Sequence, residues 1–558
     1  MNKSSTFFFL LAVLVSWHVA AQSAYNTTPD WTTQPENDVS TGLGLADING
    51  DGSKDMVIAN GNDISRQHLV VYYNDGEGNF NSTPDWESDD IDYHGHLSCG
   101  DIDSDGDTDV AVSVYIGEAG FDEPGELKVY YNTGNQLESS PSFVSEPFYT
   151  FSCALGDADG DGDLDLATVA GEPYDGILDK GKVYYNDDGI FSDENVWESD
   201  LEMGALDVAF GDFDLNGYQD LVFACEGTPN YIYLADNSGN ISTAPSWASN
   251  DENNYVNSVE VGYETAYGDT IPYIVMTEND QLGGQGRVKR YDFPAFPADS
   301  VPSWTSPSFG YGSGIKLGFS YDNAQFTKTI YYGGWWLPVE ARLIDENGFQ
   351  EPYYTTETSS VVEAIETADL DKAMMETETI GYTNEQDHAV AAIQLYNPNI
   401  ETIESVTAGG SGNEIAFSYV YGESWISLHE PLQPGNSIEI SYKASPTPDM
   451  VISNWDNVGN YIFYNTYNAT AVNSQKFAHS PEVFPNPARK KLFVKPAIKA
   501  NYEITIKSSS GRTVYKTQVS DSDKNSHAID IDDFAPGVYI LTIKHPNHTP
   551  DSRQLVIQ

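Results

Sequence analysis

The sequence GLGLADINGDGSKDMVIANG, residues 42–61, decides the fold because close copies of it recur along the chain. Further copies read HLSCGDIDSDGDTDVAVSVY from position 96, SCALGDADGDGDLDLATVAG from position 152 and DVAFGDFDLNGYQDLVFACEG from position 207. Their first aspartates, at positions 47, 101, 157 and 212, are 54, 56 and 55 residues apart. A period of this length fits one four-stranded β-propeller blade per copy.

Three weaker copies continue the repeat. They read VEVGYET, LGFSY and ETADLD, and they place Tyr263, Phe319 and Asp369 at the position of the first aspartate. Each copy also contains an aromatic strand that ends in an Asn/Asp-Gly type turn, as in VYYND, which is a hairpin signal. Seven copies predict an all-β, seven-bladed propeller. Trp31 precedes the first inner strand, so we expect the N-terminal strand to complete blade seven.

Blade seven is interrupted in the sequence. DMVISNW, from Asp449, echoes DMVIANG, from Asp55, but 372–448 separates it from the preceding strand. This segment alternates apolar and polar residues, which predicts a small β-sandwich inserted in blade seven. The alternative is a six-bladed propeller followed by an independent domain. The predicted propeller is therefore 22–371 with 449–470, and a linker follows at 471–482.

The strong copies contain the pattern D-x-[DN]-x-[DN]-G-x-x-D. Alternate side chains on a tight loop converge on one point, and a hard cation such as calcium takes six to eight oxygen ligands. Four structural Ca²⁺ sites are predicted, with the ligands Asp47, Asn49, Asp51 and Asp55; Asp101, Asp103, Asp105 and Asp109; Asp157, Asp159, Asp161 and Asp165; and Asp212, Asp214, Asn216 and Asp220.

These loops resemble the FG-GAP/VCBS repeats of integrin α-chain heads and many bacterial surface proteins. The resemblance covers about residues 25–470, and it implies calcium in the hairpin between the first two strands of a blade. Blades five and six have lost the motif, with Tyr263 and Phe319 in place of its first aspartate, and blade seven keeps only Asp369 and Asp371. The resemblance therefore implies calcium in blades one to four.

The composition and the N-terminus indicate an extracellular protein. Lys3, an apolar stretch and small residues before Gln22 predict a signal peptide at 1–21, and no other stretch of the sequence predicts a membrane span. Lys and Arg total 26 against 85 Asp and Glu, which gives a net charge of −59. So acidic a chain repels nucleic acid and suits cation binding.

The C-terminal segment 483–558 has a different character. It contains VFPNPARKKLFV from Val483, then SGR, then GVY near its end. These motifs resemble the type A sorting domain of type IX secretion in Bacteroidota. The resemblance implies a β-sandwich, contact with the type IX machinery, and delivery across the outer membrane to the medium or the cell surface.

Calcium loops of this kind lie at one face of a propeller, so we expect ligands at the other. That face should collect the glutamates and tryptophans of the opposite loops, namely Glu118, Glu172, Glu226, Glu278, Trp335 and Trp336. Sugar CH faces stack on aromatic rings while hydroxyl groups hydrogen-bond to acids and amides. The sequence therefore favours binding of an extracellular polysaccharide, or of a surface protein, with packed tryptophans and solvated glutamates as the structural alternative.

A glycan-degrading enzyme is the second hypothesis, and a polysaccharide lyase is its most specific form. β-Elimination needs a base, an acid and a group that neutralises the uronate carboxylate. The candidates on the same face are His94, His96, Tyr149, Tyr174 and Lys180. A partial ring of four glutamates would repel a polyanionic substrate, so a binding role is favoured over catalysis.

Overall fold

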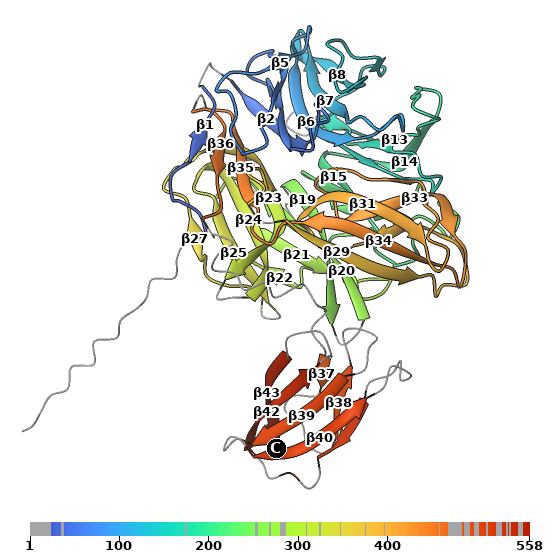
Figure 1. Cartoon of the computed structure of the whole chain (residues 1–558). Coiled ribbons are helices and arrows are strands. Elements are labelled where there is room, and N and C mark those ends of the chain that lie inside the picture. The colour runs from blue at the N-terminus through green and yellow to red at the C-terminus, as the bar shows by residue number, and fades with distance from the viewer. Residues whose placement is uncertain are drawn as a thin grey trace, which may run out of the picture. The chain divides into compact units, whose positions relative to one another are not determined.

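The computed structural model describes residues 24–466, except 35–37, 173–175, 251–254, 267–268, 280–285, 308–309, 323–324, 346–347, 374, 396 and 457, and parts of 482–557 that include seven strands. The predicted signal peptide lies outside the described residues. Every regular element in the described part is a β-strand (Figure 1). No helix there is long and apolar enough to cross a membrane. Contacts divide the chain into two compact units, 1–469 and 470–558.

In the first unit, antiparallel strands form seven groups of four. Groups one to four are β2 (Ser40–Ala46), β3 (Asp55–Asn60), β4 (Leu69–Tyr72) and β5 (Trp86–Glu87); β6 (Tyr93–Gly100), β7 (Asp109–Gly117), β8 (Gly120–Tyr130) and β9 (Phe143–Val144); β10 (Cys153–Gly156), β11 (Asp165–Thr168), β13 (Ile177–Tyr184) and β14 (Val196–Met203); and β15 (Ala205–Gly211), β16 (Asp220–Cys225), β17 (Tyr231–Tyr233) and β18 (Trp247–Ala248). A short strand, β12 (Gly171–Glu172), also pairs with β13.

The remaining groups follow the same order. They are β19 (Val256–Ala266), β20 (Asp269–Glu278), β21 (Val288–Asp292) and β22 (Trp304–Thr305); β23 (Gly312–Asp322), β24 (Gln325–Leu337), β25 (Glu340–Asp345) and β27 (Tyr354–Thr355); and β28 (Ser360–Ala368), β35 (Asp449–Asn454), β36 (Tyr461–Phe463) and β1 (Trp31–Thr32). β26 (Gly348–Phe349) pairs with β25. β24 also pairs with β28, which joins groups six and seven into one larger sheet.

The first strands of the groups form a closed ring. Each of β2, β6, β10, β15, β19 and β23 contacts the first strand of the next group, and β28 contacts β2. The predicted all-β propeller is therefore confirmed. As expected from Trp31, the N-terminal strand β1 pairs with β36 and supplies the fourth strand of group seven.

The outer aromatic residues of the repeat bind neighbouring groups together. Trp86 of group one packs edge-on against Tyr130 of group two, with ring centroids 6.3 Å apart. Trp247 of group four packs in the same way on Tyr291 of group five, at 5.2 Å. Offset and edge-to-face aromatic pairs contribute beyond the area they bury. The periodic aromatic residues are therefore packing residues between blades.

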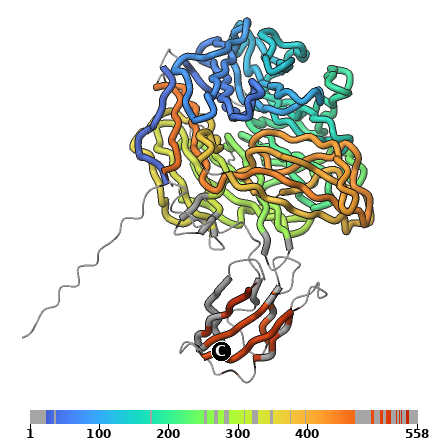
Figure 2. The backbone as a smooth tube through the Cα atoms, viewed as in Figure 1, coloured from blue at the N-terminus to red at the C-terminus, as the bar shows by residue number. Residues whose placement is uncertain are grey.

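The segment between β28 and β35 folds as two three-stranded sheets around a common apolar core. One sheet has the order β29 (Glu376–Thr383), β34 (Ser437–Ala444), β31 (Ile400–Ala408); the other has β30 (Val390–Gln394), β33 (Trp425–Leu432), β32 (Phe417–Ser418). After this insertion, β35 pairs with β28 at Asp449 and Ala368, so the group resumes where it was interrupted. Figure 2 shows the orange insertion beside the cyan and green part of the chain.

The second unit contains two sheets with a shared apolar core. Their strands are β37 (Glu482–Phe484), β38 (Lys491–Lys495) and β41 (His527–Asp530), and β40 (Thr513–Val519), β39 (Tyr502–Ser508), β42 (Gly537–Lys544) and β43 (Asp551–Ile557). Alternating apolar residues such as Ile504 and Ile506 of β39 are fully buried between the sheets.

Candidate functional site

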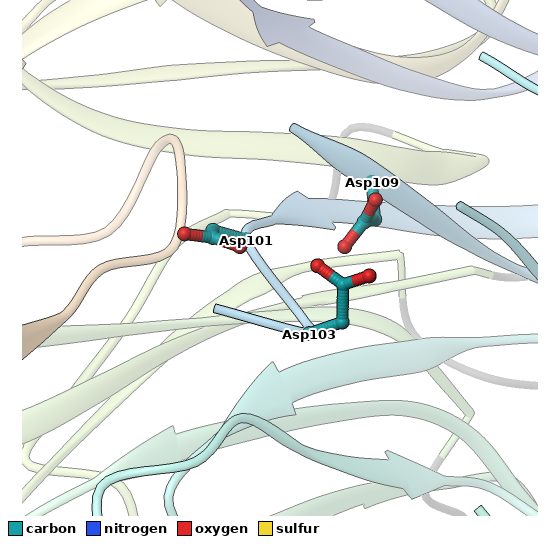
Figure 3. A group of neighbouring side chains, drawn as sticks. All are labelled: Asp101, Asp103 and Asp109. Carbon is teal, nitrogen blue, oxygen red and sulfur yellow. The ribbon is translucent and has the colours of Figure 1, made fainter. Parts of the chain in front are cut away.

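Loop two, residues 101–109, shows how the acidic motif folds between β6 and β7. Asp109 begins β7, and its Oδ2 accepts a hydrogen bond from the backbone N–H of Ile102 at 2.8 Å. Gly106 has a φ of +95°, which only glycine adopts easily and which lets the chain reverse. Asp101, Asp103 and Asp109 each offer a carboxylate oxygen, and these oxygens lie within 4.8 Å of one another. Figure 3 shows the three side chains.

Loops three and four repeat this geometry. In loop three the backbone N–H of Ala158 donates to Asp165, and in loop four that of Phe213 donates to Asp220, both at 2.7 Å. The clustered carboxylates are those of Asp157, Asp159 and Asp165 in loop three and of Asp212, Asp214 and Asp220 in loop four. These acidic clusters can hold metal ions, and an all-oxygen donor set suits a hard cation such as calcium.

The electrostatics of the loops fit a bound cation. Burial, supported by the charges of neighbouring aspartates, raises the pKa of Asp109, Asp157 and Asp212 to about 7. The pKa values of Asp165 and Asp220 are raised well above the ordinary value for the same reasons. A cation between such carboxylates favours their charged forms and would offset the cost of burying them together.

Two further loops differ from loops two to four in their carboxylates. Among the described residues, no group of three gathers in loop one, where Asn49 occupies the third motif position. In group seven, however, Asp369 and Asp371 lie within 4.8 Å of Asp449, which follows the insertion. The expectation that blade seven keeps only two acidic residues therefore missed the aspartate that opens DMVISNW.

The insertion covers loops two to four. Ser427 donates a hydrogen bond to the carboxylate of Asp157 in loop three. His388 Nε2 lies 2.8 Å from the backbone oxygen of Asn216 in loop four. The backbone N–H of Tyr421 donates to the carbonyl of Cys99, just before loop two, at 3.1 Å. The acidic end of the propeller is therefore packed against the inserted sandwich.

A central cavity of about 150 Å³ lies between the first strands of the groups, and Tyr421 and Glu423 of the insertion line it. Lys316 Nζ lies there 3.1 Å from Glu366 and 3.5 Å from Glu260. Burial raises the pKa of Glu260 to about 8, although the nearby Lys316 lowers it. Charged residues of the insertion and of the propeller thus meet inside the ring.

A larger pocket of about 520 Å³ lies at the opposite end of the strands. Its residues lie near the starts of first strands or near and after the ends of second strands, apart from Phe121 near the start of β8. The acidic loops instead join the ends of first strands to the starts of second strands. The lining residues are Asn62, Asp63, Tyr115, Phe121, Phe151, Leu206, Asn257, Trp335, Trp336, Glu363 and Trp455. We call this the aromatic pocket.

The aromatic pocket contains both predicted tryptophans. The Trp335 ring lies 5.3 Å from that of Trp455 and 6.2 Å from that of Trp336, measured between centroids. Trp336 is 62% exposed and has a φ of +57°, a conformation that costs a non-glycine residue energy. Trp335 Nε1 donates to Glu363 at 2.8 Å. Burial raises the pKa of Glu363 to about 8, helped by the charge of Asp63.

The four predicted glutamates have different environments. Glu172 is fully buried and accepts a hydrogen bond from the Tyr115 hydroxyl at 2.5 Å. Burial, and next the charge of Glu172, raise the pKa of Glu226 to about 7. Glu278 is fully buried in an ion pair with Lys289. Glu118 is exposed and lies 3.0 Å from an Arg66 nitrogen. They are not one solvated ring.

The histidine candidates lie inside the protein. His94 is fully buried, its Nδ1 lies 2.7 Å from the carbonyl of Asn60, and burial lowers its pKa. His96 lines the central cavity rather than the aromatic pocket, and its Nδ1 lies 3.8 Å from Asp207. A buried imidazole with a lowered pKa is a poor base for a polymer bound at the surface.

The other catalytic candidates have partners of their own. The Tyr149 hydroxyl donates to the carbonyl of Phe121 at 2.8 Å. Lys180 Nζ lies 3.3 Å from Glu198 on the partly exposed surface of β13. Tyr174 lies outside the described residues. None of the five candidates is among the described residues that line the aromatic pocket.

Sequence reasoning missed Asp63, Glu363 and Trp455. The repeat contains a signal for one of them, since DMVISNW aligned with DMVIANG places Trp455 opposite Gly61, at the start of the loop that contains Asp63. Glu363 has no such signal. It lies in the first half of the inner strand β28, and the pairing of β24 with β28 brings it to Trp335.

Comparison with known families supports both parts of the chain. An FG-GAP-like repeat model matches residues 47–112, and a secretion system C-terminal sorting domain model matches residues 482–558. No curated protein matches the sequence significantly. Among solved structures, the crystal structure of BBS1N in complex with ARL6DN, soaked with lead, matches with 10% identity and a TM-score of 0.39. The match covers 74% of this chain and 97% of that one.

The two family matches lie in different compact units, the repeat in the first and the sorting domain in the second. A type IX sorting tail implies delivery out of the cell and contact with the secretion machinery. The chain is thus a secreted or cell-surface β-propeller protein that combines an FG-GAP-like repeat with a type IX secretion sorting domain.

Proposed function

We propose that this protein binds an extracellular polysaccharide in the aromatic pocket, on a propeller stabilised by calcium in its acidic loops. The aromatic pocket is the observation that carries the proposal. It is large enough for sugar units, and it places three tryptophans beside the polar side chains of Asn62, Asp63 and Asn257. Concave sites of this kind, apolar with a few placed polar groups, are typical of ligand binding.

The exposure of Trp336 supports a binding role. A large apolar side chain on a surface, held in an unfavourable backbone conformation, is more easily explained by contact with a ligand than by folding. Its neighbour Trp335 is fixed by the hydrogen bond to Glu363. The pocket thus combines a rigid aromatic wall with an exposed ring on which a sugar face can stack.

Affinity electrophoresis or calorimetry with algal and plant polysaccharides tests this proposal. We expect binding that Trp336→Ala weakens at least tenfold, about the contribution of one stacked ring. Ile190→Ala removes a similarly exposed apolar side chain, 68% exposed and outside the pocket, and should leave affinity unchanged. Equal loss in both variants, or no binding to any glycan, would contradict the proposal.

The same panel separates binding from lyase activity. β-Elimination of a uronate polymer creates an unsaturated product that absorbs ultraviolet light, and no such absorbance is expected. Product that disappears in a His94→Ala, His96→Ala double variant would establish the enzymatic alternative. Binding of a surface protein, unaffected by Trp336→Ala, would instead place the ligand site elsewhere.

Calcium can be tested independently of glycans. The residues predicted to bind it are those of the four acidic loops, and Asp369, Asp371 and Asp449 add a further candidate. Extracellular sites of this type bind with dissociation constants of about 10⁻⁴ to 10⁻³ M. Chelation should therefore lower the melting temperature, because calcium binds only the folded state. An unchanged melt after thorough chelation would exclude a structural metal.

Truncation tests the sorting tail. Deleting 483–558 removes most of the second compact unit and leaves the strands of the propeller intact. We expect a folded protein that accumulates in the periplasm and does not reach the surface. Normal surface delivery of the truncated chain would contradict the secretion route.

A further inference from the structure

The aromatic pocket has an unusual charge for a glycan site. Its described lining includes two carboxyl side chains, Asp63 and Glu363, and no lysine or arginine. The whole chain carries a net charge of −59, which adds to the negative potential of any concave surface. A uronate or sulfated sugar would meet two acidic groups without a counter-charge. A cationic ligand would be attracted.

Polar atoms of the lining residues also lack partners. Asp63 Oδ1, Asn257 Oδ1 and Trp455 Nε1 are buried and have no hydrogen-bond partner among the described atoms. Asn257 is only 9% exposed. Buried polar atoms are nearly always satisfied, so each orphan atom requires an explanation. Two are acceptors and one is a donor, and terminal carboxyl and amide torsions rotate readily toward a ligand.

The tryptophans favour a cation for a separate reason. Aromatic faces attract ammonium groups through their quadrupole, and tryptophan does so most strongly. The Trp335 ring lies 5.3 Å from that of Trp455, at an interplanar angle of 60°, and 6.2 Å from that of Trp336, at 80°. Rings inclined in this way present faces in different directions rather than one flat stacking platform.

From these three observations we propose that the aromatic pocket recognises a sugar unit with a free, protonated amino group, and hence a glycan that contains non-acetylated amino sugars. This inference rests on the proposed function and specifies its ligand. The ammonium group lies among the tryptophan faces and pairs with Asp63 and Glu363. A sugar oxygen accepts the Trp455 N–H, and an N–H or hydroxyl group donates to Asn257.

The raised pKa of Glu363 is consistent with this assignment. Burial raises the pKa of this group to about 8 in the absence of a ligand. An adjacent ammonium group would lower that pKa, because an opposite charge favours the ionised carboxylate. Acetylation of the amine removes the positive charge and adds bulk. The pocket should therefore distinguish the two forms of the same sugar.

Calorimetry with three oligosaccharides of equal length tests the inference on the full chain. The ligands are a glucosamine oligomer, its N-acetylated counterpart and a galacturonate oligomer. We expect the glucosamine oligomer to bind at least tenfold more tightly than the acetylated one, with a preference that salt reduces. The galacturonate oligomer should bind most weakly.

Two variants show whether the carboxylates cause the preference. Asp63→Asn and Glu363→Gln keep the shape and, for Gln, an oxygen that can accept from Trp335. Each should reduce the preference for the free amine at least threefold and leave binding of the acetylated oligomer nearly unchanged. Glu404→Gln removes a partly exposed carboxylate of the insertion, outside the pocket, and should have no effect. Asp63 is less buried than Glu363, so Asp63→Asn is informative even if Glu363→Gln unfolds.

The outcomes separate the inference from the proposed function. Equal Trp336-dependent binding of the free and acetylated oligomers would overturn the amino-sugar assignment while glycan binding stands. Preference for galacturonate would also overturn it. Failure to bind these oligomers and every polysaccharide of the wider panel would overturn both.

Discussion

The two ends of the propeller strands are made of opposite kinds of residue. At one end, short loops hold aspartates within 4.8 Å of one another, and the insertion packs over loops two to four. At the other end, aromatic side chains surround an open pocket. The difference suggests that the acidic end stabilises the ring and that the aromatic end binds the ligand. Substitutions in the acidic loops should therefore leave ligand affinity unchanged, and substitutions of exposed rings in the aromatic pocket should leave stability unchanged.

The largest stability loss is expected in loop three. Asp165→Ala removes a buried carboxylate that accepts backbone N–H groups from Ala158 and Asn186, and it removes a predicted calcium ligand. We expect the unfolding free energy in calcium to fall by about 3 kcal/mol. Glu264 lies in β19 of group five, which continues where groups two to four have an acidic loop. Glu264→Ala breaks a partly exposed pair with Arg290 and should cost about 1 kcal/mol or less.

Denaturant unfolding of both variants measures this difference. Glycan affinity, measured on the folded fraction, should be the same in both. A large loss of glycan affinity in folded Asp165→Ala would show that the two ends are coupled and would contradict their separate roles.

A smaller loss is expected where the insertion meets the ring. The Tyr421 ring lies 3.8 Å from Lys54 Nζ, and its hydroxyl is 3.4 Å from Thr108 Oγ1. Tyr421→Ala should lower the unfolding free energy by about 2 kcal/mol and speed proteolysis within the insertion. Glu404→Ala, which affects a partly exposed pair with Lys443 and a long hydrogen bond from Ser441, should cost at most about 0.5 kcal/mol. Equal protease resistance would show that Tyr421 does not hold the insertion.

At the aromatic end, one substitution should separate stability from binding. Trp336→Gly relieves the positive φ, and the lost ring is mostly exposed, so the variant should be at least as stable as the parent. Its glycan affinity should nevertheless fall at least tenfold. Melting curves and calorimetry on the same preparation check both parts. A marked drop in melting temperature would mean that Trp336 is a packing residue.

The smallest effect concerns pH. The folded pKa of Glu363, about 8, lies above that of an exposed glutamate, so the folded state binds a proton that the unfolded state releases. The contribution of this group to stability is therefore greatest at low pH and is lost as pH rises toward 8. Glu363→Gln should reduce the protons taken up on folding between pH 5 and 8 by up to one. An unchanged pH profile would contradict the raised pKa.

The sequence predicted features within one segment well, and it predicted clusters of residues from distant segments poorly. The motif spacing identified the acidic loops, and the echo of Asp55 at Asp449 identified the interrupted strand. Neither observation showed that Asp449 lies beside Asp369 and Asp371 and completes a further carboxylate cluster, because the insertion separates Asp449 from them in the sequence. The domain boundaries and the ligand sets remain predictions.

The pocket could be predicted only in part, for a similar reason. Trp335 and Trp336 stood out in the sequence, but their neighbours in the pocket are distant along the chain. Glu363 and Trp455 come from group seven, and Asp63 comes from group one and meets the tryptophans only when the ring closes. The different burial of His94 and His96 was also not evident. Residues two apart share one face of a regular strand, whereas β6 is irregular between His94 and Leu97.

The pairing of β1 with β36 has a consequence for the order of folding. Thr32 lies opposite Tyr461. The first propeller strand to be synthesised therefore cannot pair until one of the last has been made. Closing so long a loop is entropically costly and slow compared with the hairpins of the other groups. The ring therefore closes late, and until it does the edges of groups one and seven stay open to misassembly or to chaperones. Because the second compact unit follows this closing strand, an intact tail marks a chain that already contains everything needed to close the ring.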